Sequence, residues 1–305
     1  MRPRDLLTWT LYGLLRLLFR LPWRWRLALG RGLGGLLHRV LRGPRHTARV
    51  NLRLVHPELL PEAIEALVKR HFRELGMAVF ELTEAWWADS RELEAMVDFD
   101  GLEHLEAARA SGRGVLLLTP HLTNLELGAR FVALRLPFVI NFKPDKDPLV
   151  DRLVRGNRAR VLPQLVPADD VRGMLRALQE GRAMWYAPDI DYKGQGRLFV
   201  DFLGVPASMA PQAAKIAARG DALVLPYMPL RRPDGRYTLL IEPPLSGFPS
   251  GDAGTDTRRL GAALEGLVRR RPDNYLWIMR RFRTRPDGGP NPYRAARAAA
   301  TPPPA

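Results

Sequence analysis

From Gly101 onward, short apolar segments alternate with longer stretches of helical periodicity, and this alternation limits the fold more than any other feature of the chain. Runs of about four to eight apolar residues predict buried strands, whereas apolar residues three and four positions apart predict helices. Because strands that alternate with helices pack as a helix-covered sheet, we expect an α/β fold. The candidate strands are Val115 to Leu118, Phe138 to Phe142, Ala183 to Ala187, Leu223 to Leu230, Tyr237 to Glu242 and Leu276 to Met279.

The first third of the chain shows helical patterns and no strand candidate. It begins with an apolar stretch from Leu6 to Leu15, after which Arg16 and Arg20 interrupt the pattern. Since a spanning helix needs about 20 apolar residues, we expect this segment to anchor the protein either flat on a membrane or as a marginal single span. The alternative is an ordinary amphipathic helix packed on the domain. Further helices are predicted at Trp25 to Leu41, Thr47 to Leu54, Pro61 to Leu75 and Ala78 to Ala88.

The charge of the chain favours an anionic partner. Lys and Arg together number 47 against 32 Asp and Glu, which gives a formal net charge of +15. Residues 1–53 contain twelve arginines and one acidic residue, and the arginines are interleaved with Leu, Trp and Phe. This mixture is typical of a segment that lies on an anionic bilayer. Nucleic acid is the other common polyanion, but no RNP-like run, zinc-finger spacing or helix-turn-helix pattern stands out.

Composition and periodicity together predict three segments. Residues 1–45 are expected to form membrane-anchoring helices, residues 46–286 the α/β domain, and the Pro- and Ala-rich residues 287–305 a disordered tail. The chain contains no cysteine, which excludes disulfides, thiolate metal sites and a thiol nucleophile. Catalytic groups must therefore be oxygen or nitrogen groups.

A histidine and a glutamate follow the first strand of the predicted sheet. The apolar run Val115 to Leu118 ends at Thr119-Pro120, His121 comes next, and Glu126 stands five positions later. Thr123 and Glu126 have the spacing of a capping box, so we expect a helix to begin here with Glu126 in its first turn, facing His121. A carboxylate on one ring nitrogen leaves the other free to accept a proton, which is what a general base requires. The alternative is that Glu126 only caps the helix and His121 is a polar loop residue.

The surrounding sequence resembles a known family. A His-x4-Asp/Glu motif after an apolar strand resembles the glycerolipid acyltransferase superfamily, and Leu127-Gly-Ala-Arg130 behind the glutamate resembles the lipid A late (secondary) acyltransferases. The resemblance extends from about residue 5 to about residue 293. Segments that carry it include Asn51-Leu52, His56-Pro57-Glu58, Asp147-Pro148-Leu149, Gly173 to Leu178, Trp185 to Tyr192, Phe199 to Gly204, Arg231 to Gly235 and Tyr275 to Pro286.

The resemblance implies an activity and a setting. The reaction would transfer a fatty acyl chain from the thioester of acyl carrier protein to the hydroxyl of a 3-hydroxyacyl chain on a Kdo-lipid A precursor, with no other cofactor. His121 would be the general base and Glu126 the carboxylate that orients it. The fold would be similar to the glycerol-3-phosphate acyltransferase type, with a mixed sheet flanked by helices and an N-terminal helical anchor. The enzyme would act as a monomer on anionic lipid, at the cytoplasmic face of a bacterial inner membrane.

Further site residues follow from the same resemblance. It assigns Arg158, with Arg160 close behind, to the developing oxyanion or to a substrate phosphate, since a guanidinium suits both. Asp189 follows the strand candidate that ends at Ala187, so we expect it on the same rim as His121, holding an arginine or the acceptor. Asp191 is a weaker candidate. Two nearby carboxylates without a convergent histidine make a poor metal site, so no metal is expected.

The sequence offers two further groups of candidate binding residues, a basic run and two tryptophans. The basic run Arg280 to Arg285 predicts a patch that meets substrate phosphates, the acidic carrier protein or membrane lipid. Trp185 and Trp277 are candidates for the lining of an acyl channel, although aromatic residues in strands more often belong to the core. The alternatives to lipid A acylation are acylation of another glycolipid, such as a phosphatidylinositol mannoside, and a non-catalytic membrane lipid-binding protein of the same fold.

Overall fold

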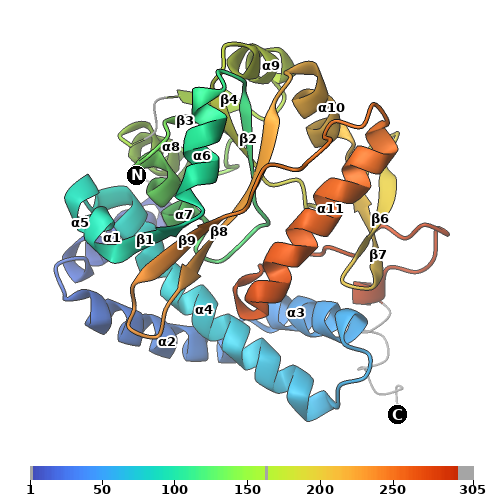
Figure 1. Cartoon of the computed structure of the whole chain (residues 1–305). Helices are drawn as coiled ribbons and strands as arrows, with labels where there is room; N and C mark the ends of the chain where they lie inside the picture. Colours follow the sequence, from blue (N-terminus) through green and yellow to red (C-terminus); the bar gives the residue numbers. More distant parts are fainter. Residues whose placement is uncertain (1–2, 162–163, 295–305) are drawn as a thin grey trace.

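The computed structural model describes residues 3–161 and 164–294 of the 305-residue chain. Figure 1 shows helices packed around a central sheet. The first third is helical: α1 (Pro3–Leu18), α2 (Trp23–Val40), α3 (Arg42–Val55), α4 (Pro61–Trp87) and α5 (Ser90–Met96). The remaining elements are β1 (Val97–Asp100), α6 (Leu102–Ala110), β2 (Val115–Leu118), α7 (Leu125–Ala133), β3 (Phe138–Phe142), α8 (Pro148–Ala159), β4 (Gln164–Pro167), α9 (Val171–Gln179), β5 (Ala183–Tyr186), β6 (Leu198–Phe202), β7 (Val205–Met209), α10 (Gln212–Arg219), β8 (Leu223–Arg231), β9 (Tyr237–Ile241), α11 (Ala253–Arg270) and the 3-10 helix η1 (Pro272–Asn274).

A seven-stranded sheet lies at the centre, in the order β1-β9-β8-β2-β5-β3-β4. Neighbouring strands run parallel except β8 and β9, which are antiparallel. Parallel strands are covered on both faces, which explains why β2 consists only of buried Val and Leu. Strands β6 and β7 form a separate antiparallel hairpin. The predicted α/β fold is confirmed.

The side chains of β2 point alternately into two halves of the core. Leu116 and Leu118 contact the apolar cluster that α9, α10 and α11 help to build. Val115 and Leu117 contact the opposite cluster, which contains side chains of α6 and α7. Because side chains alternate along a strand, this one short strand fixes both layers against each other. The residues that follow it therefore start from a rigid position.

Helix α2 packs on α4 at backbone contact. A Cβ added at Gly34 would lie 2.2 Å from the carbonyl oxygen of Phe72, and one at Gly76 would lie 2.1 Å from the carbonyl oxygen of Gly30. A side chain does not fit at either position, so the glycines allow the two helices to touch. Within the segment 1–45, helix α2 is thus packed closely on α4.

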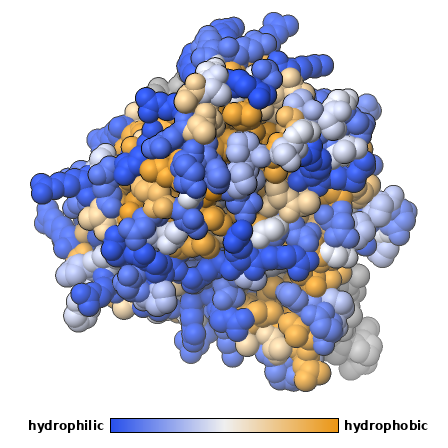
Figure 2. Space-filling view, in the orientation of Figure 1, coloured by the Kyte–Doolittle hydropathy of each residue, from blue (hydrophilic) through white to orange (hydrophobic). Residues whose placement is uncertain are grey.

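The outer faces of α1 and α2 carry exposed apolar side chains between arginines. Elsewhere on the molecule, the face seen in Figure 2 is largely hydrophilic, with apolar areas between the charged side chains. Within the described part of the chain, no helix has both the length and the apolar character needed to cross a bilayer. The spanning form of the predicted N-terminal anchor is therefore unsupported. The exposed apolar residues are Leu6, Leu7, Trp9, Leu11, Leu14 and Leu17 on α1, and Trp25, Leu29, Leu36 and Val40 on α2.

The predicted strands are confirmed with one exception, the segment from Leu276 to Met279. It forms tight turns, in which the backbone amide of Trp277 donates to the carbonyl of Tyr275 at 2.8 Å and that of Met279 to Leu276 at 3.0 Å. The buried amide of Asn51 donates to the carbonyls of Trp277 and Met279, at 2.6 Å each, and so stabilises these turns. Apolar content alone was misleading here. Strands β1, β4, β6 and β7 were not among the predicted strands.

Two predicted boundaries also differ. Helix α4 is continuous, whereas the sequence predicted separate helices before and after Gly76, because this glycine serves the contact with α2 and ends no helix. In the predicted tail, Tyr293 is buried and its hydroxyl accepts the backbone N–H of Phe282 at 2.9 Å. The beginning of this segment therefore packs on the domain. Residues 295–305 lie outside the described residues.

Candidate active site

Two neighbouring parallel strands each deliver a functional side chain three residues after their ends. Strand β2 ends at Leu118 and β5 at Tyr186, and these two residues are paired in the sheet. A proline follows two residues later in both cases, and the next residues are His121 and Asp189. Because both segments leave the same edge of the sheet in the same way, their side chains meet at the carboxyl ends of the strands, where open α/β sheets bind ligands.

His121 and Asp189 form two hydrogen bonds. The ring Nδ1 lies 2.6 Å from Asp189 Oδ1, and the backbone N–H of His121 donates to Asp189 Oδ2 at 3.0 Å. The Asp189 side chain is 0% exposed and that of His121 is 19% exposed. With Nδ1–H directed at the carboxylate, the ring's Nε2 is left to accept a proton.

The protonation states of the two groups depend on each other. Burial lowers the pKa of His121, but the charge and hydrogen bond of Asp189 outweigh this and hold it above 6.5. Burial raises the pKa of Asp189, but the charge of His121 and the hydrogen bonds from its ring and backbone amide bring it below 3.8. The pair therefore stabilises a protonated imidazole next to an ionised carboxylate, the state that a general base reaches after it has taken a proton.

The predicted pairing of His121 with Glu126 is wrong. Helix α7 begins at Leu125 with Asn124 as its N-cap, so the capping box expected from Thr123 does not form. Glu126 instead binds Arg158: the guanidinium Nε lies 3.0 Å and 3.2 Å from the two carboxylate oxygens, and Nη2 makes a further close contact. The carboxylate that holds His121 comes from the neighbouring strand.

Arg158 and Glu126 are both partly exposed, at 22% and 23% of their side chains. Helix α8 presents Arg158, and the preceding Asn157 fastens this helix to α4, since its Oδ1 accepts the indole N–H of Trp87 at 3.2 Å. The Nη1 of Arg158 makes no hydrogen bond to the described residues. Glu126 therefore holds the Nε–Nη2 edge of the guanidinium, and Nη1 stays available to a ligand.

The remaining predicted site residues lie elsewhere. Arg160 is exposed at the C-terminal end of α8. Asp191 accepts hydrogen bonds from the backbone N–H of Thr284 at 3.0 Å and from its hydroxyl at 3.1 Å, so it ties two loops together. Trp277 belongs to the core, is 1% exposed, and is not among the residues that line the groove beside the His121–Glu126 segment described below. Trp185 is half-buried and packs against the core cluster that contains Leu117 of β2.

The basic run after η1 is not a uniform patch. Arg280 is exposed, whereas Arg281 is buried at 1% exposure and Arg283 and Arg285 are half-buried. Seen as a sequence, the arginines looked equivalent. The fold turns one of them into the interior.

An apolar groove of about 320 Å³ lies beside the His121–Glu126 segment. One wall is a stripe of α4 formed by Leu75, Ala78, Val79 and Leu82, at the spacing of one helix face. The other wall is the chain from Leu122 to Leu127, with Leu276 at its side. Glu126 is part of this wall, His121 directly precedes it in the chain, and Glu81 lines the groove from α4. An aliphatic ligand fits such a groove better than a charged one.

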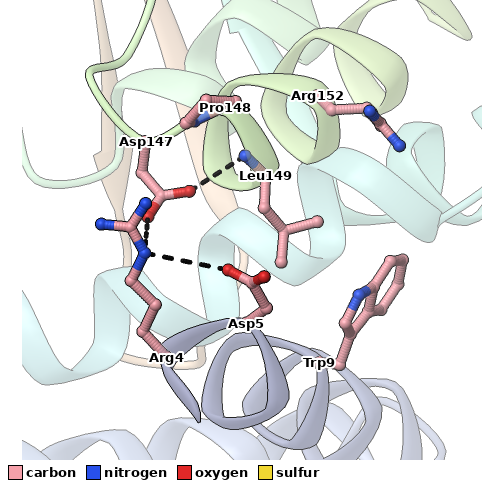
Figure 3. Close-up of a pocket in the computed structure, with 7 residues that line it drawn as sticks. All are labelled: Arg4, Asp5, Trp9, Asp147, Pro148, Leu149 and Arg152. Carbon is pink, nitrogen blue, oxygen red and sulfur yellow. Dashed lines mark hydrogen bonds and ion pairs between the residues drawn. The ribbon is translucent and has the colours of Figure 1, made fainter. Parts of the chain in front are cut away.

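A second hollow, of about 340 Å³, lies between the first turns of α1 and α8 (Figure 3). Arg4 and Arg152 line it together with the carboxylates of Asp5 and Asp147, and Trp9 stands at its side. Arg4 Nε lies 3.7 Å from Asp147 Oδ2, so the ion pair links the two helices. This hollow contains none of the predicted site residues, and its charges are largely used within the protein.

No group of three or more His, Asp and Glu side chains that suits a metal ion occurs among the described residues. The sequence reasoning missed the pairing of His121 with Asp189, and a signal for it exists. Leu118-Thr-Pro-His121 and Tyr186-Ala-Pro-Asp189 share a strand-x-Pro-x pattern, and adjacent parallel strands would bring the fourth residues together.

Comparison with known proteins gives consistent results. Residues 1–284 match the family model described as bacterial lipid A biosynthesis acyltransferase. The chain is 34% identical over 295 residues to the lipid A biosynthesis lauroyltransferase of Escherichia coli K12, covering 96% of each chain. It is 33% identical to the palmitoleoyltransferase of the same organism, covering 94% of each, and 27% identical to its myristoyltransferase, covering 86% and 82%. The crystal structure of a 1-acyl-sn-glycerophosphate acyltransferase from Thermotoga maritima aligns with a TM-score of 0.38 and 17% identity, over 76% of this chain and 97% of that one.

Proposed function

The chain belongs to the bacterial lipid A biosynthesis acyltransferase family and is an acyltransferase; on this premise, we propose that it moves a fatty acyl chain from the thioester of acyl carrier protein to a hydroxyl of a lipid A precursor. The acceptor is the hydroxyl of a 3-hydroxyacyl chain on the Kdo-bearing intermediate. The observation that carries this proposal is the hydrogen bond between His121 and the buried carboxylate of Asp189 at the rim of the sheet.

His121 is the general base in this proposal. Its Nε2 accepts the proton of the acceptor hydroxyl as the oxygen attacks the thioester carbonyl, and Asp189 stabilises the imidazolium that results. The tetrahedral intermediate then collapses, the carbon–sulfur bond breaks, and the imidazolium returns the proton to the departing thiolate. No acyl-enzyme is needed, which agrees with the absence of cysteine from the chain.

Arg158 stabilises the oxyanion. Attack on the thioester places negative charge on the carbonyl oxygen, and a donor that is already oriented stabilises this charge without reorganising. Glu126 holds the guanidinium through Nε and Nη2, and Nη1 remains for the oxyanion. Glu126 thus serves the arginine, and Asp189 has the role that the sequence suggested for Glu126. Contact of Arg158 with a substrate phosphate is the alternative role.

The groove between α4 and the Leu122–Leu127 segment receives the acyl chain. Its walls are mainly aliphatic, its charged lining residues are Glu81 and Glu126, and His121 directly precedes its lining residue Leu122. Burying methylene groups in it contributes about 0.8 kcal/mol for each one. The small side chain of Ala78 stands within the leucine stripe of α4 and leaves space that a longer side chain would fill.

The exposed leucines and arginines of α1 and α2 lie on the membrane. Helices with one apolar side and many arginines bind flat at the surface of anionic bilayers, and the apolar residues on α1 are about half exposed, with Leu7 at 60% and Leu11 at 52%. The lipid acceptor resides in the bilayer, so this orientation brings the enzyme to its substrate. The enzyme then works at the cytoplasmic face of the inner membrane, where acyl carrier protein is present.

The test is transfer by the purified protein. Full-length enzyme, lauroyl or myristoyl acyl carrier protein and Kdo-lipid A precursor are mixed in detergent, and acylated product is measured by mass spectrometry. We expect turnover by the wild type and by His104→Asn, which changes a histidine outside the site, and a loss of about 10²–10⁴-fold in His121→Asn. Equal turnover in all three proteins, or transfer to another glycolipid in place of the lipid A precursor, would contradict the proposal.

A further inference from the structure

Arg281 is a buried arginine that contacts neither substrate nor reacting atoms in the proposed transfer. Its side chain is 1% exposed and its guanidinium carbon lies 5.1 Å from the centre of the Phe202 ring. One nitrogen, Nη1, donates to the carbonyl of Ser208 at 2.7 Å. The other two, Nε and Nη2, are buried without a hydrogen-bond partner among the described residues. A permanently charged group is thus held in the interior by a single neutral acceptor.

The fold holds the segment that carries Arg281 against the loops that carry His121 and Asp189. Asp191 and Thr284 are joined by two hydrogen bonds, which hold the loop that carries Asp189 against the segment that carries Arg281. The rings of Tyr275 and Phe202 pack with their centres 5.6 Å apart, and Phe202 is also the residue whose ring contacts the Arg281 guanidinium. On the other side of Arg281, the backbone N–H of Leu276 donates to the carbonyl of His121 at 2.9 Å. The segment that carries the buried Arg281 is thus fastened to the His121 loop before it and to the Asp189 loop after it, and its guanidinium makes no hydrogen bond to Asp189 among the described residues.

A charge removed from water is stable only when an opposite charge or several hydrogen bonds replace the water. Asp189 is fully buried, and its hydrogen bonds come from His121, which is neutral before it takes a proton. Arg281 supplies a positive charge in the same region whatever the state of His121, since an arginine is not deprotonated in proteins.

We propose that Arg281 is a positioning residue of the acyl transfer: its buried charge keeps Asp189 ionised and limits how strongly His121 holds a proton. The inference rests on the base function proposed for His121. A base that held its proton too tightly would be unable to accept the next one at neutral pH, so a nearby fixed positive charge keeps the pair in its working range.

The electrostatics of the surrounding groups agree with this role. The charge of Arg281 lowers the pKa of His121, against the effect of Asp189, and it lowers the pKa of Asp189 in the same direction as His121 does. The other titratable groups here are tyrosines: burial and the charge of Asp189 raise the pKa of Tyr275 well above 10, and burial likewise raises that of Tyr293, which Asp191 and Arg280 also influence. Both phenols stay neutral during catalysis, so Arg281 is the fixed charge.

The experiment is a titration of the His121 ring in full-length, histidine-labelled protein by NMR, with the signal assigned through His121→Asn. The variants are R281Q, which removes the charge, R281K, which keeps it, and R280Q, which removes the charge of the exposed neighbour. We expect the pKa of His121 to rise in R281Q and to stay near the wild-type value in R281K and R280Q. The acidic limb of kcat/KM should move to higher pH in R281Q alone, with a loss of about tenfold at neutral pH, part of the 10²–10⁴-fold that a general base contributes.

Three results would overturn the inference. They are an unchanged His121 titration in folded R281Q, an equal shift in R280Q, and failure of both R281Q and R281K to fold, which would make Arg281 a structural residue only. The titration needs no substrate, so it is separate from the proposed function. If His121→Asn kept full transfer while R281Q still shifted the titration, the base assignment would fail and the electrostatic link would stand.

Discussion

Replacement of Asp189 by Asn tests whether Asp189, and not Glu126, is the carboxylate that orients His121. The change keeps the size of a side chain that is fully buried and removes its charge. An amide nitrogen in this position would donate to Nδ1 of His121, which moves the ring proton to Nε2. The imidazole would then present a donor to the acceptor hydroxyl, and it would have no lone pair there to take the proton.

The expected loss follows from the role of the base. General base catalysis contributes about 10²–10⁴-fold, or about 3 to 5 kcal/mol of transition-state stabilisation, and Asp189→Asn removes most of it. The pH profile gives a second sign. The base works in its neutral form, so wild-type kcat/KM falls as the pH drops through the raised pKa of His121. Removing the Asp189 charge lowers that pKa, so the acidic limb of the residual activity should move to lower pH.

The assay is the rate of acyl transfer to a lipid A precursor across the pH range, with thermal unfolding measured on the same samples. Asp169→Asn is the matched control, because Asp169 is an exposed aspartate that also follows a strand of the sheet, β4. We expect this control to behave as the wild type. Near-normal turnover of folded Asp189→Asn, or an acidic limb that moves to higher pH, would refute the reasoning.

Three further predictions address the other parts of the site. Glu126→Gln frees the guanidinium of Arg158 and should lower kcat by about tenfold to a hundredfold without moving the acidic limb, and a shift of that limb equal to that of Asp189→Asn would restore the original pairing. Ala78→Phe fills the groove and should shift the preferred acyl donor toward shorter chains when donors of different chain length are compared. The control Ala66→Phe, on an exposed turn of the same helix, should leave this preference unchanged. Identical chain-length profiles for the two variants would contradict binding of the acyl chain in the groove. Leu7→Asp puts a charge on the exposed face of α1 and should weaken sedimentation with anionic vesicles severalfold while the unfolding midpoint stays constant, and undiminished vesicle binding would contradict the flat orientation.

Much of the fold could be predicted from the sequence because it depends on local patterns. The buried run of β2 is apolar at every position, as a central parallel strand requires, so it was found with its correct ends. Leu276 to Met279 has a similar composition and was misread, because the amide of Asn51, which comes from a distant helix, determines its turns. Periodicity contains no information about such a contact.

The site was harder to predict for the same reason. His121 and Glu126 are neighbours in the sequence, and their pairing seemed to need only a helix start. Asp189 is 68 positions away from His121 and becomes its neighbour only because β2 and β5 are adjacent in the sheet. The strand order cannot be read from one sequence, although the shared strand-x-Pro-x pattern hinted at it. Likewise the burial of Arg281 beside the exposed Arg280 depends on the packing around Phe202.

The most direct test of the whole account is the mass of lipid A in cells that lack this protein and then regain it. The account predicts that the wild-type chain adds the mass of one fatty acyl group to the lipid A precursor, and that His121→Asn, expressed at the same level, adds none. An unchanged lipid A profile with the wild type, or full acylation by His121→Asn, would contradict it.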